Sequence, residues 1–461
     1  MKGNILKVMA LVLSALLILT AFAGCAEQNE QDPAASQRER KNSEGLRFAS
    51  NGDGTCYVSW IGDCKDADIV IPTTSPTGEK VTSIGDSAFK GCTSLKSITI
   101  PEGVTSIGWS AFQGCTSLKS ITIPDSVTHI GNYAFFNTAY HNKTSNWDRV
   151  SGDSFHGVLY IGNHLITASM GFNGCSYAIK PGTKCIADGA FGSCKSLENV
   201  TIPDSMTSIG NRAFDGCTSL KSITIPEGVT SIGDGAFDGC TSLKSITIPE
   251  GVTSIGDGAF KGCTRLASII MPDSVTSGIV FHETFYGCTS LKSIAIPEGV
   301  TSIGNRAFEG CTSLESIAIP EGVVDIGFDA FKGCTRLASI TIPDSVTRIC
   351  SDAFCDTAYY NAGSNWDYGA VLYVGNYLIK AKTSIFGRCA IKTGTKCIAD
   401  EAFYGCTSLT SITIPEGVTS IGVCAFEGCT RLESIAIPES VVSIGWGAFG
   451  GCTRLDGTFN Y

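Results

Sequence analysis

The sequence has few basic side chains for its length. Lys and Arg number 33 against 43 Asp and Glu, which gives a net charge of −10 and an isoelectric point near 5.1. A protein that binds nucleic acid needs a stripe or patch of basic residues that displaces counterions from phosphates. The sequence contains no such stripe, so we predict that nucleic acid is not a partner.

Histidine is also scarce, and the usual signatures of catalysis are missing. There is no nucleophile elbow, no phosphate-binding loop and no HExxH motif, and no CxxC pair or interleaved histidine supports zinc. Tyr360 and Tyr377 stand where His141 and His164 of a similar earlier segment align, so we interpret these histidines as surface loop residues. We predict no catalytic, cofactor or metal site and no enzymatic activity. The histidines are His129, His141, His156, His164 and His282.

Long hydrophobic runs are absent outside the first 25 residues, "MKGNILKVMALVLSALLILTAFAGC". Lys2 and Lys7 precede an apolar run, Val8 to Leu19, which is too short for a confident membrane span and is typical of a secretory signal. The ending Phe-Ala-Gly-Cys25 resembles a bacterial lipobox, although family examples usually have Leu where Phe stands. The resemblance implies cleavage before Cys25 and lipidation of its thiol; an ordinary signal peptide is the alternative. Residues 26–46 are polar and are predicted to form a flexible tether.

Glycine, in contrast, is abundant at 53 residues, and much of it belongs to an internal repeat. Residues 216–237 and 239–260 have identical sequences, "GCTSLKSITIPEGVTSIGDGAF". Most repeats are 23 residues long, a period in the range of leucine-rich repeats and too short for ankyrin or propeller units. Phenylalanine recurs at one position of the repeat. These residues are Phe89, Phe112, Phe135, Phe191, Phe214, Phe237, Phe260, Phe285, Phe308, Phe331, Phe354, Phe403, Phe426 and Phe449.

The spacing of apolar residues changes within each repeat. Ile98 and Ile100 are two residues apart, as in a half-buried strand, and Pro101 ends that strand because it cannot donate to a ladder. From Val104 to Cys115 the apolar residues follow at intervals of three or four, which indicates a helical or turn-rich return. One repeat alone cannot bury these residues, but stacked coils share a continuous core.

This pattern resembles the treponemal-type leucine-rich repeat of BspA-like bacterial surface proteins. The motif Leu-x-x-Ile-x-Ile-Pro, then Val-x-x-Ile-Gly, then Ala-Phe-x-Gly-Cys recurs over roughly residues 68–455. The resemblance implies an α/β repeat solenoid, an arc with short parallel strands on the concave face and irregular or short helical returns on the convex face. In one copy the motif is carried by Leu220, Ile223, Ile225, Pro226, Val229, Ile232, Gly233, Ala236, Phe237, Gly239 and Cys240.

Two longer segments interrupt the regular count and resemble each other. "NTAYHNKTSNWDRV" at Asn137 parallels "DTAYYNAGSNWDYG" at Asp356, and each segment then returns to the repeat register through "GTKCIAD". We therefore predict the following organisation: signal peptide 1–24, lipid-anchored cysteine and linker 25–46, N-terminal cap 47–80, regular repeats 81–135, irregular coils 136–180, regular repeats 181–354, irregular coils 355–392, and repeats with the C-terminal end 393–461.

The chain contains 22 cysteines, and twelve of them occupy one position of the repeat. Equivalent atoms of adjacent coils are about 4.8 Å apart, too far for a disulfide, so these cysteines are predicted to pack as small apolar residues. Cysteines outside that position are candidates for disulfides in an exported protein, and packing or free thiols are the alternative. The candidate pairs are Cys56 with Cys64, Cys175 with Cys185, and Cys389 with Cys397.

Acidic residues follow the strand proline in nearly every repeat, as in Glu102 and Asp125. A column of carboxylates could attract calcium, but solvated turn residues are the favoured interpretation. If Ile246 and Ile248 point inward, strand alternation places Ser245, Thr247 and Pro249 on the concave side, with Lys244 at its edge. A polar strip of this kind suits extended contacts with protein or glycan. Its predicted members are Ser222, Thr224, Lys244, Ser245 and Thr247.

The two irregular segments add aromatic residues that could form hot-spot contacts. These are Tyr140, Trp147, Tyr359, Tyr360 and Trp366. The alternative is that they only cover the irregular coils. The family resemblance implies adhesion, so the sequence predicts an exported, lipid-anchored, monomeric protein of the bacterial cell surface that contacts host matrix or neighbouring-cell proteins. A glycan-binding accessory protein is the alternative function.

Overall fold

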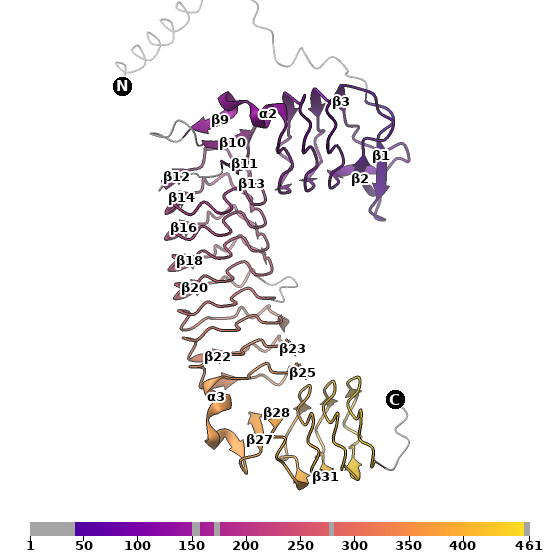
Figure 1. Cartoon of the computed structure of the whole chain (residues 1–461), viewed down its shortest axis with the longest axis vertical. Helices are drawn as coiled ribbons and strands as arrows, with labels where there is room; N and C mark the ends of the chain where they lie inside the picture. Colours follow the sequence, from indigo (N-terminus) through magenta and orange to yellow (C-terminus); the bar gives the residue numbers. More distant parts are fainter. Residues whose placement is uncertain (1–41, 150–156, 170–175, 276–280, 456–461) are drawn as a thin grey trace, which may run out of the picture. The chain divides into compact units, whose positions relative to one another are not determined.

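The computed structural model describes residues 42–149, 157–169, 176–275 and 281–455. The chain divides into two units, Met1–Asn42 and Ser43–Tyr461. Apart from Asn42, everything described here belongs to the second unit. That unit is a solenoid of stacked coils, and Figure 1 shows β14, β16, β18 and β20 following one another along one side of it.

Most regular coils contribute one short strand with the sequence Ser-Ile-Thr or a close variant; residues 293–295 have the equivalent sequence but form no strand. In β18 (Ser245–Thr247) the isoleucine is buried and its two neighbours are exposed, because side chains alternate across a strand. The strands pair in parallel, and equivalent residues of successive coils lie opposite each other. The exposed residues before and after each buried isoleucine therefore form two parallel columns along the solenoid. The predicted solenoid of short parallel strands is confirmed. The strands of this first column are β3 (Asp68–Val70), β5 (Ser97–Thr99), β7 (Ser120–Thr122), β12 (Ser176–Ala178), β14 (Asn199–Thr201), β16 (Ser222–Thr224), β18, β20 (Ser268–Ile270), β22 (Ser316–Ala318), β24 (Ser339–Thr341), β29 (Gly387–Ala390), β31 (Leu409–Thr413) and β33 (Ser434–Ala436).

A second column of strands was not predicted. It consists mostly of a Ser-Ile pair, such as Ser231–Ile232, which the spacing analysis assigned to a helical or turn-rich return. The return in the regular coils consists of this strand and turns, since two residues are enough to pair with the coils above and below. The members are β4 (Lys80–Ile84), β6 (Ser106–Ile107), β8 (His129–Ile130), β13 (Cys185–Ile186), β15 (Ser208–Ile209), β17 (Ser231–Ile232), β19 (Ser254–Ile255), β21 (Ser302–Ile303), β23 (Asp325–Ile326), β25 (Arg348–Ile349), β30 (Cys397–Ile398), β32 (Ser420–Ile421) and β34 (Ser443–Ile444).

The irregular segments contain the helices of the described residues and two antiparallel hairpins. In the first segment, α2 (Ala139–Asn142) and the 3-10 turn η1 (Thr144–Asn146) lead to β9 (Trp147–Arg149), β10 (Gly157–Ile161) and β11 (His164–Ala168). The second repeats this order with α3 (Ala358–Asn361), η2 (Gly363–Asn365), β26 (Trp366–Asp367), β27 (Val371–Val374) and β28 (Tyr377–Ala381). Strands β11 and β28 then pair in parallel with β13 and β30, which restores the coil register.

The N-terminal end of the unit is covered by another hairpin. Strand β1 (Arg47–Ser50) pairs antiparallel with β2 (Thr55–Trp60), and β2 pairs in parallel with β4 of the first regular coil. Cys56 and Val58 of β2 are completely buried. This hairpin therefore occupies the place of a preceding coil and shields the apolar residues of β4.

Ladders of identical side chains fill the core. The phenylalanine rings of successive coils stack nearly parallel, with centroids 5.0 to 5.8 Å apart, in three uninterrupted series. We name the coils that carry these series the first stack (Phe89, Phe112, Phe135), the second stack (Phe191, Phe214, Phe237, Phe260, Phe285, Phe308, Phe331, Phe354) and the third stack (Phe403, Phe426, Phe449). The series end where the irregular segments begin.

The repeated cysteine lies beside the phenylalanine ladder and has a second role. Cys217 and Cys240 are completely buried free thiols, which confirms the predicted packing role. Each also donates its S–H to the phenylalanine carbonyl of the preceding coil; from Cys240 Sγ to Phe214 O the distance is 3.2 Å. The Phe214 carbonyl also accepts the backbone N–H of Cys217 over 3.1 Å, so the buried thiol is the second donor to this carbonyl and ties one coil to the next.

The glycine after the second-column isoleucine permits close stacking at one corner. A Cβ on Gly233 would lie 2.5 Å from the backbone nitrogen of Asn211 in the preceding coil. The third residue after the second-column isoleucine is left-handed in coil after coil, with φ of 58° at Gly235 and 56° at Glu401, although Ala399 replaces the glycine in the coil of Glu401. Glycine adopts that conformation without strain, whereas a non-glycine residue pays for it.

Candidate functional site

The structure brings the end of each stack against the side of the next at two equivalent joints. The first joint consists of Thr128, His129 and Ile130 of the first stack against Asp188 and Ser208 of the second. The second joint consists of Thr347, Arg348 and Ile349 against Asp400 and Ser420 of the third stack. These residues lie 50 or more positions apart, and the sequence pattern gave no signal that they meet.

Backbone and hydroxyl hydrogen bonds hold both joints in the same way. The amide of Asp188 donates to the carbonyl of Ile130 over 2.8 Å, and that of Asp400 donates to Ile349 over 2.9 Å. Ser208 and Ser420 donate their hydroxyls to the carbonyls of Thr128 and Thr347. The two irregular segments therefore build the same connection twice.

The charged contact at each joint differs in chemistry. Nε2 of His129 lies 3.6 Å from Oδ2 of Asp188, whereas Nη2 of Arg348 lies 3.0 Å from Oδ2 of Asp400. Burial raises the pKa of the Asp188 carboxyl, and the neighbouring His129 opposes that rise. The guanidinium of the second joint keeps its charge at all physiological pH values.

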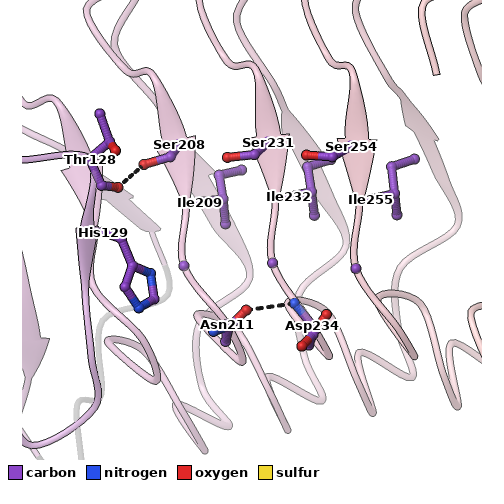
Figure 2. A pocket seen from close by; sticks show the side chains of 13 residues that line it. Thr128, His129, Ser208, Ile209, Asn211, Ser231, Ile232, Asp234, Ser254 and Ile255 are labelled. Atoms are coloured by element: carbon purple, nitrogen blue, oxygen red, sulfur yellow. Dashed lines mark hydrogen bonds between the residues drawn. The ribbon is translucent and has the colours of Figure 1, made fainter. Parts of the chain in front are cut away.

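A groove with a volume of about 360 Å³ runs from the first joint along the second strand column (Figure 2). Figure 2 shows Ser208, Ser231 and Ser254 on successive strands, next to Ile209, Ile232 and Ile255, with Thr128 and His129 on the neighbouring segment. Hydroxyls, isoleucine side chains and glycines thus line one continuous surface. Such a surface can accept a ligand in extended conformation through hydrogen bonds and apolar contact.

One wall of this groove is a ladder of acidic and amide side chains. Oδ1 of Asp188 accepts the backbone N–H of Asn211 over 2.7 Å, and Oδ1 of Asn211 accepts that of Asp234 over 2.8 Å, as Figure 2 shows for the second bond. Asp234 repeats the contact with the amide of Asp257 over 2.9 Å. These side chains therefore stabilise the stacking, and only their remaining polar atoms are available to a ligand.

The groove continues past Asp234 into a second hollow of about 410 Å³ that is strongly charged. Lys261 forms an ion pair with Glu283, and the hydrogen bond between them raises the pKa of the lysine and lowers that of the glutamate. Burial raises the pKa of Asp238 on the same surface. Groups that can hold a metal ion are not found among the residues that the structure describes.

The strip predicted on the first strand column is exposed as expected, with one correction. Ser222, Thr224, Ser245 and Thr247 alternate with buried isoleucines, and Lys244 stands exposed at the edge. Pro249, which was predicted to face the same side, is buried. Alternation ends where the strand ends, so a residue after Thr247 cannot be placed by counting.

The aromatic residues predicted as hot spots are used mainly within the protein. Trp147 and Trp366 donate Nε1–H to the carbonyls of His141 and Tyr360, both over 2.7 Å. Tyr359 donates its hydroxyl to the carbonyl of Tyr373, and Tyr140 makes the equivalent bond to Tyr160. Tyr140, Trp147, Tyr359 and Tyr360 are half-buried.

Trp366 is 8% exposed, so its place in the predicted binding surface was wrong. The tryptophan is part of the second-stack core, together with Leu372 and Val374 of the hairpin that follows it, and is therefore withdrawn from the surface. Within the second irregular segment, the strongly exposed aromatic residues are Tyr368 at 99% and Phe386 at 80%. Their loop positions carried no distinguishing signal in the sequence.

The disulfides predicted from sequence are not formed within the described part of the chain. Cys56, Cys64, Cys185, Cys389 and Cys397 are free thiols. Cys56 and Cys64 are both buried, and burial raises the pKa of Cys185 to about 12 and that of Cys397 to about 11. Cys175 and the predicted lipidation site Cys25 lie outside the described residues.

The stacked parallel strands, the 23-residue period and the internal ladders define a leucine-rich repeat solenoid. A family model described as "BspA type Leucine rich repeat region (6 copies)" matches residues 67–171, 166–279, 276–362 and 375–459. The chain therefore belongs to the BspA type leucine-rich repeat family. This confirms the family resemblance drawn from the repeated motif.

Solved structures with a similar chain come from several bacteria. A leucine-rich repeat protein from Bacteroides ovatus is 30% identical, covering 90% of this chain and 93% of that one, with a TM-score of 0.38. A leucine rich cell surface protein from Faecalibacterium prausnitzii is 29% identical over the same shares, with a TM-score of 0.32. A leucine rich repeat protein of T. pallidum is 28% identical, covering 50% of this chain and 91% of its own, with a TM-score of 0.26. The search of curated proteins found no match.

Helices in the described ranges are all too short or too polar to cross a membrane.

Proposed function

We propose that this protein is displayed on the bacterial cell surface and binds an extracellular protein of the host matrix or of a neighbouring cell. The observation that carries the proposal is the groove of about 360 Å³ at the first joint, which combines hydroxyls, isoleucines and partly exposed glycine backbone. An extended peptide offers amides, carbonyls and side chains at spacings that such a surface can satisfy. The name of the Faecalibacterium relative, a cell surface protein, supports the proposed location.

The exposed hydroxyl strip of the first strand column is the second candidate contact surface. Successive strands present Ser222 and Ser245 in register, and Thr224 and Thr247 lie beside them. The strip is flat and polar, so it would add contact area without a deep pocket. Strong contacts are expected at the groove, because it is hollowed and a ligand in it can contact several successive strands at once.

The test uses the purified protein from residue 26 onward and proteins from candidate host surfaces or neighbouring cells. Ser231→Arg with Ser254→Arg blocks the groove, and Ser245→Arg with Thr247→Arg blocks the strip. Thr393→Arg is the matched control, because Thr393 is exposed and belongs to neither surface. Loss of binding at least tenfold in the groove variant supports the proposal; a protein that captures no partner, or an unaffected groove variant, contradicts it.

Cys25 is proposed as the site of lipidation that holds the protein at the membrane, and the chain is proposed to act as a monomer without enzymatic activity. Replacement of Cys25 by Ser should release the protein from the membrane fraction and remove the acyl mass. If the Cys25→Ser protein still fractionates with membranes, the anchor lies elsewhere. Reproducible turnover of a substrate by the purified protein would overturn the non-enzymatic assignment.

A glycan-binding accessory role is the second candidate, and it is favoured by Tyr368 and Phe386. Both rings are strongly exposed, at 99% and 80%, and an exposed aromatic face can stack on a sugar ring. Glycan binding that is lost in Tyr368→Ala or Phe386→Ala would support this role. Binding that survives both changes, or a glycan array without signal, would exclude these rings as its site.

A further inference from the structure

The first joint contains a completely buried histidine, His164, so the interpretation of this residue as a surface loop residue was wrong. His164 begins β11 and is 0% exposed, and its Nε2 lies 3.0 Å from the carbonyl oxygen of Val127 in the first stack. A carbonyl can only accept, so Nε2 carries the hydrogen and the imidazole donates across the joint. His164 thus links the irregular segment to the stack that precedes it.

The second joint has a different side chain at the same place. Tyr377 begins β28, is 1% exposed, and donates its hydroxyl to the carbonyl of Pro343. Burial raises the pKa of this phenol, so it stays neutral from acid to neutral pH. The duplicated joint therefore offers an internal comparison between an imidazole and a phenol in the same structural role.

Few charged groups surround His164. Asp125, from the turn after β7, is exposed and accepts a hydrogen bond from the Asn163 amide over 2.9 Å. Cys185 of β13 lies opposite His164 in the sheet, and its raised pKa of about 12 keeps it neutral. Tyr160 of β10 also has a raised pKa because it is buried, and Lys184 precedes Cys185 with a partly exposed side chain.

The remaining charged contact of this joint is the pair His129 and Asp188, described above. Burial lowers the pKa of His164 below 6.5, while the Val127 and Ile161 carbonyls and Asp125 oppose that shift. A folded-state pKa below the unfolded value means that the folded protein disfavours the protonated ring. The stability that His164 supplies is complete above pH 6.5 and declines as the pH falls toward its lowered pKa.

We propose that the first joint is acid-sensitive, because uptake of a proton by the buried His164 weakens it, and that the second joint, built with Tyr377 and Arg348, is not. One consequence rests on the proposed function: Thr128 and His129 form part of the groove, so a weakened joint would lower affinity for a ligand in that groove. The acid sensitivity itself does not depend on any ligand.

Hydrogen exchange on the whole protein at pH 7.5, 6 and 5, corrected for the intrinsic pH dependence of exchange, tests the joints directly. The amide of Asp188 reports the first joint, and that of Asp400 reports the second, because each donates across its joint. Below pH 6.5 the protection of the Asp188 amide should fall by up to about tenfold per pH unit. The protection of the Asp400 amide should not change. Equal behaviour of the two amides, or constant protection of Asp188, overturns the proposal.

Two substitutions exchange the critical side chains. His164→Tyr, which copies Tyr377, should abolish the acid response of the first joint, and Tyr377→His should create one at the second. The two variants are independent, so the failure of one to fold leaves the other as the test. His129→Gln and His141→Gln are the controls; if either removes the response of the first joint, the assignment to His164 is wrong.

Ligand binding separates this inference from the proposed function. If exchange shows the expected acid response but the groove binds no protein at any pH, the joint proposal stands and the groove function fails. If the groove binds but the Asp188 amide stays equally protected at all three pH values, the reverse holds.

Discussion

Replacement of one ring inside the phenylalanine ladder tests how the coils support one another. Phe237 is completely buried and stacks on Phe214 and Phe260, with centroids 5.4 and 5.5 Å away. Removing a buried phenylalanine side chain costs about 3–5 kcal/mol. Phe237→Ala should lie at the upper end of that range, since both ring contacts are lost and the rigid coils on either side limit collapse of the cavity.

The last ring of the second stack provides the comparison. Phe354 is completely buried and stacks on Phe331 at 5.4 Å, its one stacked ring among the described residues. An aromatic pair contributes about 0.5–1.5 kcal/mol beyond area burial, so Phe354→Ala should cost roughly 1 kcal/mol less than Phe237→Ala. Phe260→Ala should match Phe237→Ala, because residues 216–237 and 239–260 have the same sequence.

Urea unfolding followed by circular dichroism, together with hydrogen exchange of the second stack, measures these differences. Exchange is needed because a solenoid this long can unfold in parts, and each part then has its own free energy. Equal losses for Phe237→Ala and Phe354→Ala would refute the idea that two-sided stacking stabilises the interior coils. A large difference between Phe237→Ala and Phe260→Ala would show that local sequence does not decide the cost.

Three further predictions concern the backbone corners and the thiols. Gly233→Ala should destabilise the protein by about 2 kcal/mol or more, because its Cβ would lie 2.5 Å from the Asn211 backbone nitrogen. Gly363→Ala is the control and should be nearly neutral in the same thermal unfolding experiment, because no atom lies within 4 Å of its Cβ. Equal effects of the two substitutions would contradict the argument from close backbone approach. Glu401→Gly should raise stability by up to about 1 kcal/mol in thermal unfolding, since φ is 56° there, and a lower melting temperature would show that the glutamate side chain matters more than backbone strain. At pH 8 a thiol reagent should modify the half-buried end cysteines Cys92 and Cys452 well before Cys288, which is completely buried and whose burial raises its pKa to about 12. Mass spectrometry that finds Cys288 modified first would refute this order.

The regular coils could be predicted from sequence because their main contacts join residues one repeat apart. Phe214 stacks on Phe237, and Ile223 is equivalent to Ile246 of the next coil. Residues 23 positions apart are therefore the ones expected to lie next to each other. The buried isoleucines and the free core cysteines follow from that rule. The second strand column was missed because two residues, such as Ser231 and Ile232, are too few to show alternation.

The acid and amide ladder was hidden for a similar reason. Asp188, Asn211 and Asp234 look like ordinary turn residues, and only the structure shows each side chain accepting an amide from the next coil. Trp109 and Phe328 at the same position show that the repeat tolerates a side chain without an acceptor. Because the residue type at this position varies, the sequence does not distinguish a ladder of hydrogen-bonded side chains from a row of solvated turn residues.

The sequence by itself determined the family, the coil period and the apolar rungs of the core, because identical units that stack must place identical residues against each other. Tertiary structure alone decided the joints and the groove beside the first one. His129 meets Asp188, and His164 meets the carbonyl of Val127, through single contacts between unlike elements, where the chain leaves its repeat. Such contacts have no period, so no pattern in the sequence marks them, and their geometry exists only once two stacks have folded and packed.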